Sequence, residues 1–192
     1  PTGVTLTSSG TTTRSVSGGH VLDNSGTFTM SGPHDIQITG SGATFNNLPG
    51  GVFTITDNST FEDVAGAVGV FNNSGIFQKT GSAGAAFFSR PGTSFVGDFK
   101  NVGAAGGVIN INSGTLSFNA GTNAIEAGST LNVSSGAIAL FETGTHTVSG
   151  AITGAGGVSV ATGNATISGT FSATGPVTVF SGSGTFNSSA MN

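Results

Sequence analysis

The sequence contains no cysteine, no tryptophan and no tyrosine, and charged residues make up only 6% of its 192 residues. Without cysteine, neither disulfide bonds nor thiolate chemistry is available to the chain. The net charge is −4 and lysine and arginine together number four, so no basic patch exists that could neutralise nucleic-acid phosphates. No apolar run approaches the roughly 20 residues that a transmembrane helix needs. These absences exclude nucleic-acid binding and predict that no helix spans a membrane.

Glycine and β-forming residues dominate what is present. The chain has 34 glycines and 15 phenylalanines, and hydrophobic residues make up 35% of it. Disordered chains usually combine high net charge with few apolar residues, whereas valine, isoleucine and phenylalanine recur here, and these favour strands. No stretch has the apolar spacing of an amphipathic helix. The composition therefore predicts an all-β protein.

One short phrase recurs along the chain: a phenylalanine or leucine, any residue, an asparagine, and then a turn into another strand. Its copies start at Leu22, Phe45, Phe71 and Phe99. Between the turns lie short segments whose apolar residues alternate with serine, threonine or asparagine, the pattern of a half-buried strand. Two or three such strands per repeat predict a single right-handed parallel β-helix, or β-solenoid, with coils of about 20–28 residues.

An antiparallel β-sandwich is the alternative fold, because frequent turns also suit it. We prefer the solenoid because the Asn-Gly and Asp-Gly hairpin turns that are usual in sandwiches are missing. Residues 1–100 hold ten of the twelve charged residues, and the repeat becomes tighter and simpler from residue 101 onward. Because no linker separates the two halves, we expect residues 1–192 to form one solenoid domain.

Stacked coils place equivalent side chains above one another, so two interior rows are expected. One is an apolar core of stacked phenylalanines. The other is a ladder of asparagine amides at a turn, which would satisfy backbone groups there. The predicted core residues are Phe28, Phe45, Phe53, Phe71, Phe77, Phe99 and Phe118. The predicted turn and ladder residues are Asn24, Asn47, Asn73, Asn101 and Asn112.

Much of the chain, from Leu22 to Phe186, resembles the repeats of large bacterial surface and secreted proteins. The resemblance rests on residues 71–81 (FNNSGIFQKTG), 107–118 (GVININSGTLSF) and 144–157 (GTHTVSGAITGAGG). Proteins with such repeats are the autotransporter-passenger and haemagglutinin-like adhesin β-helix proteins. The resemblance implies a β-helix at the cell surface that acts as a stalk, adhesin or matrix component. It implies a fold and a location better than an activity.

Acidic residues give one weak candidate site. Asp57, Glu62 and Asp63 could form a Ca²⁺ loop, although they lack the regular spacing and glycine of known calcium loops. A carbohydrate-active enzyme would need these carboxylates to meet Lys79, Arg90 or Lys100 in a groove. We instead interpret the acidic segment as a solvated turn, and we expect no catalytic residue, cofactor or metal.

Histidine and threonine also give no site. His20, His34 and His146 are far apart and lack metal-ligand spacing, so we expect them at the surface. Thr-x-Thr triplets begin at Thr5, Thr27, Thr54 and Thr145, and their irregular spacing argues against ice binding.

A free solenoid needs polar caps, because each of its ends exposes unpaired strand edges. No amphipathic capping helix is visible at either end, so we expect the ends to be covered by further coils or by other subunits. The leading hypothesis is a non-catalytic structural protein, secreted to the cell surface or extracellular matrix. It would act as a filament subunit through head-to-tail self-association or as an adhesin stalk. The alternative is a module that binds polysaccharide or a host surface.

Overall fold

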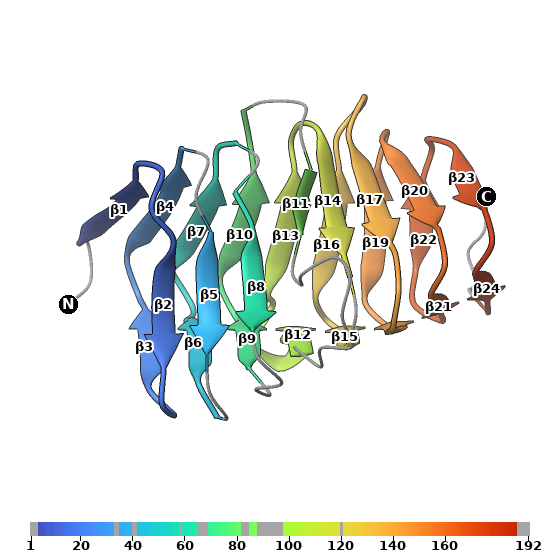
Figure 1. The fold of residues 1–192 in the computed structure, drawn as a ribbon. Coiled ribbons are helices and arrows are strands. Elements are labelled where there is room, and N and C mark those ends of the chain that lie inside the picture. Colours follow the sequence, from blue (N-terminus) through green and yellow to red (C-terminus); the bar gives the residue numbers. More distant parts are fainter. Residues whose placement is uncertain are drawn as a thin grey trace.

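The computed structural model describes residues 4–32, 35–39, 42–57, 59–64, 69–81, 85–87, 98–119 and 121–187. Every strand pairing among these residues is parallel. The strands stack side by side along one axis (Figure 1), and each successive coil adds one strand to each of three faces. The predicted β-solenoid is therefore confirmed, and the antiparallel sandwich is wrong.

The first face is an eight-stranded parallel sheet. Its strands present apolar side chains to the interior at alternate positions, such as Phe28 and Met30 on either side of the half-exposed Thr29. This alternation follows from the two-residue period of a strand. In order along the rod, the strands are β1 (Thr5–Ser9), β4 (Thr27–Ser31), β7 (Val52–Ile55), β10 (Ile76–Lys79), β13 (Val108–Ile111), β16 (Thr130–Val133), β19 (Ala151–Gly154) and β22 (Phe171–Ala173).

The second face is divided into a three-stranded and a five-stranded sheet. β2 (Arg14–Ser17), β5 (Ile36–Thr39) and β8 (Phe61–Val64) form the first of these sheets. The five-stranded sheet contains β11 (Ala85–Phe87), β14 (Thr115–Phe118), β17 (Ile138–Phe141), β20 (Gly157–Val160) and β23 (Val177–Val179). β8 lies next to β11, so the face continues from one sheet to the other.

The third face is again an eight-stranded parallel sheet. Its strands are β3 (Val21–Asn24), β6 (Thr44–Asn47), β9 (Val70–Asn73), β12 (Asp98–Asn101), β15 (Thr122–Ile125), β18 (Thr145–Val148), β21 (Asn164–Ile167) and β24 (Ser183–Phe186). The one helix of the described residues, the 3-10 turn η1 (Gly103–Ala105), follows β12. No helix in this part of the chain is long and apolar enough to cross a membrane.

Coil length changes along the rod. On the first face Ile76 pairs with Val108, so the coil between them is longer than the sequence predicted. On the third face Thr145 pairs with Asn164, which makes that coil slightly shorter than predicted. The predicted range of coil lengths is therefore too narrow at both ends. The longest coil contains η1 in addition to its three strands. In the C-terminal coils only short turns separate one strand from the next. Coils after η1 are shorter than the longest one, as the pairings of Val108 with Thr130 and of Ile152 with Phe171 show.

Phenylalanine rings fill the interior of the first coils. On the first face the rings of Phe28 and Phe53 stack with centroids 5.1 Å apart and 2° between planes. On the third face Phe45 and Phe71 stack at 4.9 Å, also with 2° between planes. The two stacks meet edge to face, as at Phe53 and Phe71, 5.3 Å apart at 84°. Offset and edge-to-face arrangements are the favoured geometries of aromatic pairs.

The structure buries all seven phenylalanines that the sequence indicated as core. They belong to three columns, one on each face: Phe28, Phe53 and Phe77; Phe45, Phe71 and Phe99; and Phe118. Phe118 stacks on Phe141 at 5.3 Å, a core residue that the repeat did not indicate. Farther along the rod, isoleucine and leucine replace phenylalanine in the first-face column and valine replaces it in the second-face column. In the third-face column Phe99 is followed by Asn123, His146 and Ala165.

Candidate functional site

Four asparagines form a continuous amide ladder inside the corner between the third and first faces. Asn24 Nδ2 donates to Asn47 Oδ1, Asn47 Nδ2 to Asn73 Oδ1, and Asn73 Nδ2 to Asn101 Oδ1, each at 2.7 Å. Asn47, Asn73 and Asn101 are fully buried. Each amide also donates to the backbone carbonyl of the first residue in a first-face strand farther along the chain, as Asn73 does to Val108 O in β13 at 3.0 Å. The ladder thus joins the asparagine amides to one another and to backbone carbonyls at the corner, so these buried polar groups have hydrogen-bond partners.

A glycine lies shortly after each of the ladder residues Asn73 and Asn101 in the sequence, because the backbone of the neighbouring coil passes close to that position. A Cβ atom on Gly75 would lie 2.3 Å from Gly51 O and 2.5 Å from Leu48 O. On Gly107 it would lie 2.3 Å from Asn73 O. These contacts are with backbone, which cannot move aside as a side chain could. The repeated Asn-Ser-Gly phrase therefore couples a ladder amide to a glycine that allows close approach.

Asn112 lies at a turn, as expected, but the prediction that it joins the ladder is wrong. Its phrase, Asn112-Ser113-Gly114, follows β13 and forms the corner between the first and second faces. There Asn112 is exposed, and its backbone N–H donates to Lys79 O at 2.9 Å. The same sequence phrase thus serves two different corners. The residue that pairs with Asn101 is instead Ile125, and the column continues with apolar residues.

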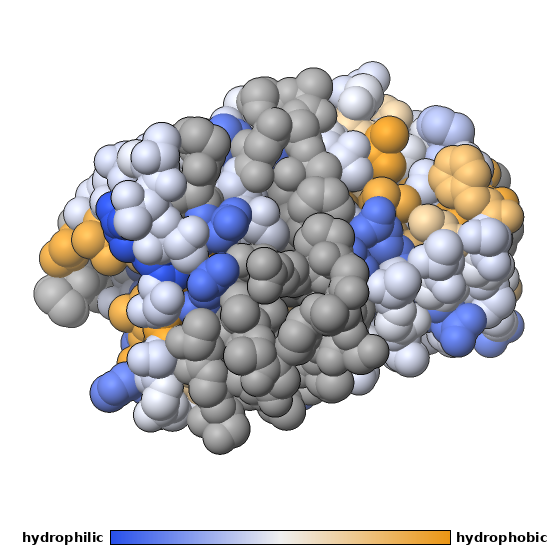
Figure 2. Space-filling view, viewed as in Figure 1, coloured by the Kyte–Doolittle hydropathy of each residue, from blue (hydrophilic) through white to orange (hydrophobic). Residues whose placement is uncertain are grey.

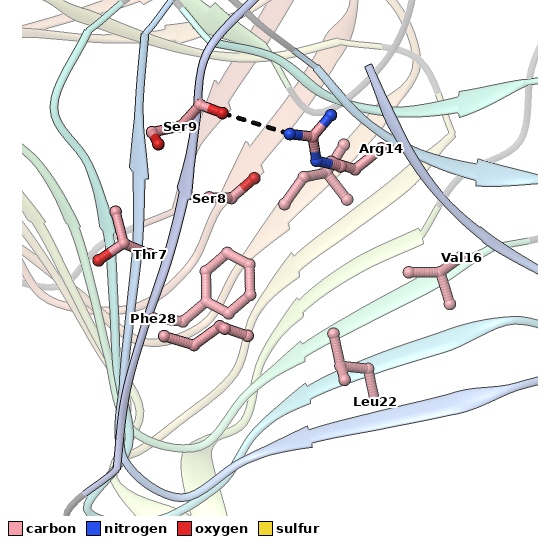
Figure 3. Close-up of a pocket in the computed structure, with 9 residues that line it drawn as sticks. Thr7, Ser8, Ser9, Arg14, Val16, Leu22 and Phe28 are labelled. Carbon is pink, nitrogen blue, oxygen red and sulfur yellow. Dashed lines mark hydrogen bonds between the residues drawn. The ribbon is translucent and has the colours of Figure 1, made fainter. Parts of the chain in front are cut away.

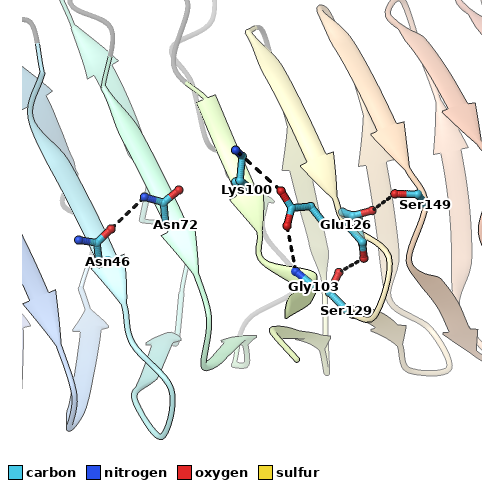
Figure 4. Close-up of polar contacts among 8 residues, drawn as sticks. Asn46, Asn72, Lys100, Gly103, Glu126, Ser129 and Ser149 are labelled. Carbon is cyan, nitrogen blue, oxygen red and sulfur yellow. Dashed lines mark hydrogen bonds and ion pairs between the residues drawn. The ribbon is translucent and has the colours of Figure 1, made fainter. Parts of the chain in front are cut away.

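A second polar row lies on the outside of the third face (Figure 4). Asn46 Nδ2 donates to Asp23 Oδ1 at 2.8 Å, and Asn72 Nδ2 donates to Asn46 Oδ1 at 2.9 Å. Lys100 continues the column, and its Nζ lies 3.8 Å from Glu126 Oε1. Both side chains of this ion pair are well exposed, so it contributes little to stability.

Asp57 acts within a turn. Its carboxylate accepts hydrogen bonds from the Ser59 N–H at 3.0 Å, from the Ser59 hydroxyl at 2.5 Å and from the Gly32 N–H. The side chains of Glu62 and Asp63 and all of Arg90 lie outside the described residues, so neither the weak Ca²⁺ candidate nor the solvated turn preferred over it is tested at those positions. Within the described ranges, no three His, Cys, Asp or Glu side chains gather as metal ligands would.

Lys79 is fully buried, which is unusual for a lysine. It lies in an interior column of the first face between Ile55 and Ile111. Its Nζ donates to Thr80 O at 3.1 Å. Desolvation lowers the pKa of Lys79, and the nearby Asp57 charge partly opposes this. The sequence does contain a signal for this burial. Lys79 follows the buried Phe77 by two residues, and side chains two residues apart in a strand point to the same side of the sheet.

His146 is also buried, so its predicted surface position is wrong. It lies on the inward side of β18, where Asn123 Nδ2 donates to its Nδ1 at 3.2 Å and its Nε2 donates to Glu142 O at 3.3 Å. Burial lowers its pKa, and hydrogen bonds to backbone oppose the shift. His20 is exposed, and His34 lies outside the described residues. Alternation with exposed Thr145 and Thr147 was the signal that His146 faces inward.

Threonine triplets do not form a regular array along the rod. Thr7, Thr29 and Thr54 share one outward column of the first face. Gln78 follows them, with its Nε2 donating to Thr54 Oγ1 at 2.9 Å, and then the column becomes asparagine at Asn110. The Thr145–Thr147 triplet lies on the third face. The threonines are therefore split between two faces.

The first coil surrounds an apolar hollow of about 360 Å³. Leu6, Val16 and Leu22, one from each face, line it together with Phe28 and Ile36 of the second coil and with polar residues that include Arg14. Figure 3 shows Val16, Leu22, Phe28 and Arg14 around the hollow. Leu6 shares a column with Phe28, yet 53% of Leu6 is exposed against 6% of Phe28. In the described part of the chain, no strand pairs with the outer edges of β1, β2 and β3.

The last described coil is likewise uncovered. Val177 and Val179 continue the columns of the fully buried Val158 and Val160, but they are 43% and 45% exposed. Phe180, directly after them, is 71% exposed. β22, β23 and β24 are the outer strands of their sheets at this end. Hydrophobic residues accordingly reach the surface at both ends of the stack (Figure 2).

Comparison with known proteins gave no match: no protein-family model, no curated protein and no solved structure is similar to the chain. The β-solenoid is therefore established by the strand pairing described above.

Proposed function

We propose that the chain is a non-catalytic structural rod that extends by stacking end to end, as a filament subunit of the cell surface or extracellular matrix. The observation that carries the proposal is the exposure of core-column residues at both ends. Interior members of those columns are buried completely, and end members such as Leu6 and Val179 are about half exposed. Unpaired strand edges with adjacent apolar surface promote association with further strands.

The polar groups of the described residues support a structural role. Asp57 and the ladder asparagines hold turns, and Glu126 accepts from the Gly103 N–H at 3.1 Å besides its contact with Lys100. These carboxylates and amides thus have partners that stabilise corners. The resemblance to bacterial surface-protein repeats agrees with this role and with an extracellular location, and an adhesin stalk is the related form of the proposal.

The test is electron microscopy and light scattering of the purified chain over a concentration series. Stacking predicts fibres whose length grows with concentration and whose width stays that of one rod. Because charged residues are few at the ends, raising salt should leave the fibres intact. Short isolated rods at every concentration would contradict filament assembly, and the side faces should then be screened against glycans.

A further inference from the structure

This inference rests on the proposed end-to-end function and specifies its joint. We propose that β22, β23 and β24 of one copy pair in parallel with β1, β2 and β3 of a second copy. The joint is therefore head to tail, and each of the three faces continues across it in register.

Strand direction determines the polarity of the joint. Each face of the rod consists of parallel strands, and β1 and β22 are the two outer strands of the same face. Joining the C-terminal end of one copy to the N-terminal end of the next repeats this parallel arrangement. A two-fold joint between like ends would place the strands antiparallel and would change the hydrogen-bonding pattern.

On the first face, the joint continues one apolar column. Leu6 of the second copy would follow Phe171 of the first, because both lie in the column that contains Phe28 and Ile152. Phe171 is already almost fully buried, at 7% exposure. Contact with Phe171 would bury the half-exposed Leu6, which would then lie relative to Phe171 as Phe53 lies relative to Phe28.

On the second face, the exposed Val177 and Val179 would cover Arg14 and Val16 of the next copy. Arg14 lies at an inward position, since its pairing partner Ile36 is buried. Its guanidinium donates to Thr12 O at 2.7 Å and to Ser9 O at 3.3 Å. With these partners in place, the aliphatic part of Arg14 is available to pack against valine.

On the third face, small and large residues are complementary. Gly184 would face Leu22, a glycine against the leucine that helps to line the hollow. Phe186 would face Asn24, the first member of the amide ladder. The rod already contains the same kind of neighbour pair, because the last ladder member, Asn101, pairs with Ile125. Charge does not oppose the contact, since residues 143–187 contain no Asp, Glu, Lys or Arg.

The absence of cysteine allows a direct test by engineered disulfides. Thr7 and Ser172 are exposed and occupy the same outward column at opposite ends of the first face. Neighbouring strands lie about 4.8 Å apart, which is within the Cα separation of about 4.4–6.8 Å that a disulfide spans. The test variant is therefore the double substitution T7C with S172C. The mismatched control is D23C with S172C, because Asp23 lies on the third face.

After mild oxidation at fibre-forming concentration, non-reducing gels should show a ladder of covalent oligomers for T7C with S172C. The mismatched pair and each single variant should stay largely monomeric, and circular dichroism should show the same fold in all of them. Dimers of T7C alone would indicate a joint between like ends and would overturn the inference. Fibres without a ladder from the matched pair would overturn it too, while leaving the proposed function intact. If the unmodified chain forms no fibres, the proposed function fails first.

Discussion

Replacing Asn73 by aspartate tests the interior amide ladder with almost no change in side-chain volume. Asn73 is fully buried, donates to Asn101 Oδ1 at 2.7 Å and to Val108 O at 3.0 Å, and accepts from Asn47 at 2.7 Å. A carboxylate can keep the third bond but makes neither donation. The buried Asn101 Oδ1 then loses this donor, Val108 O loses its bond to the side chain, and both oxygens face a negative charge.

The cost follows from these lost partners. A buried acceptor left without its donor costs about 1–3 kcal/mol, and an unpaired buried charge adds to this or forces the group to take up a proton. We therefore expect Asn73→Asp to lower the free energy of unfolding by about 3–5 kcal/mol at neutral pH. Urea unfolding followed by far-ultraviolet circular dichroism measures this. Intrinsic fluorescence is unsuitable because the chain has no tryptophan or tyrosine.

Asn72 provides the matched control. It precedes Asn73 in the same strand but lies in the outer row, where it is half-buried and donates to Asn46 at 2.9 Å. The next residue in its column is Lys100, which can attract a new carboxylate. We expect Asn72→Asp to change the free energy of unfolding by less than about 1 kcal/mol. Equal losses in the two variants would refute the claim that the buried ladder stabilises the corner.

Three further predictions concern single positions. His146 is neutral in the fold because burial lowers its pKa, so the unfolded chain takes up a proton first below about pH 6.5. The free energy of unfolding should fall as pH drops through that value and level off below the folded pKa, and urea melts from pH 5 to 8 on His146→Gln should lack this component. Gly75→Ala should cost more than about 2 kcal/mol through its backbone clash, whereas Gly157→Ala, whose nearest contact would be 3.5 Å away, should be nearly neutral in the same melts. Phe53→Ala should cost about 3–5 kcal/mol by leaving a cavity between stacked rings, against less than about 0.5 kcal/mol for the exposed Phe180→Ser; similar thermal-melt shifts for both would contradict the core assignment.

The sequence predicts the first half of the rod best, because stacking there repeats the same residue. Phe45 and Phe71, or Asn47 and Asn73, recur one coil apart, so the pattern reveals both the coil and the columns. In the second half the same columns hold residues of different type, as where Asn101 is followed by Ile125. In that half the coil shape and the buried positions recur, but the residues at those positions differ. A search for repeated residue types therefore does not detect these coils.

The buried polar residues show a second limit. Residue type predicts a surface position for His146, and a buried lysine such as Lys79 is unusual, although alternation within their own strands places both side chains inside. At these positions the residue type predicts an exposed side chain, whereas the alternation predicts a buried one. Only the register with the neighbouring strands shows which prediction is right. Asn112 shows the converse, because its local phrase copies the ladder turn while its coil position belongs to another corner.

The coils at the C-terminal end of the rod have equal lengths, so the length of the rod could change without a change in its fold. Ile138 pairs with Gly157, Thr145 with Asn164 and Ile152 with Phe171, so the offset along the chain is the same on each face. Duplicating or deleting one such coil would leave every remaining strand beside a partner in the same register. This change would lengthen or shorten the molecule by one strand spacing, about 4.8 Å. A gene encoding this chain could therefore adjust the reach of its product in small steps by unequal recombination, without altering either end.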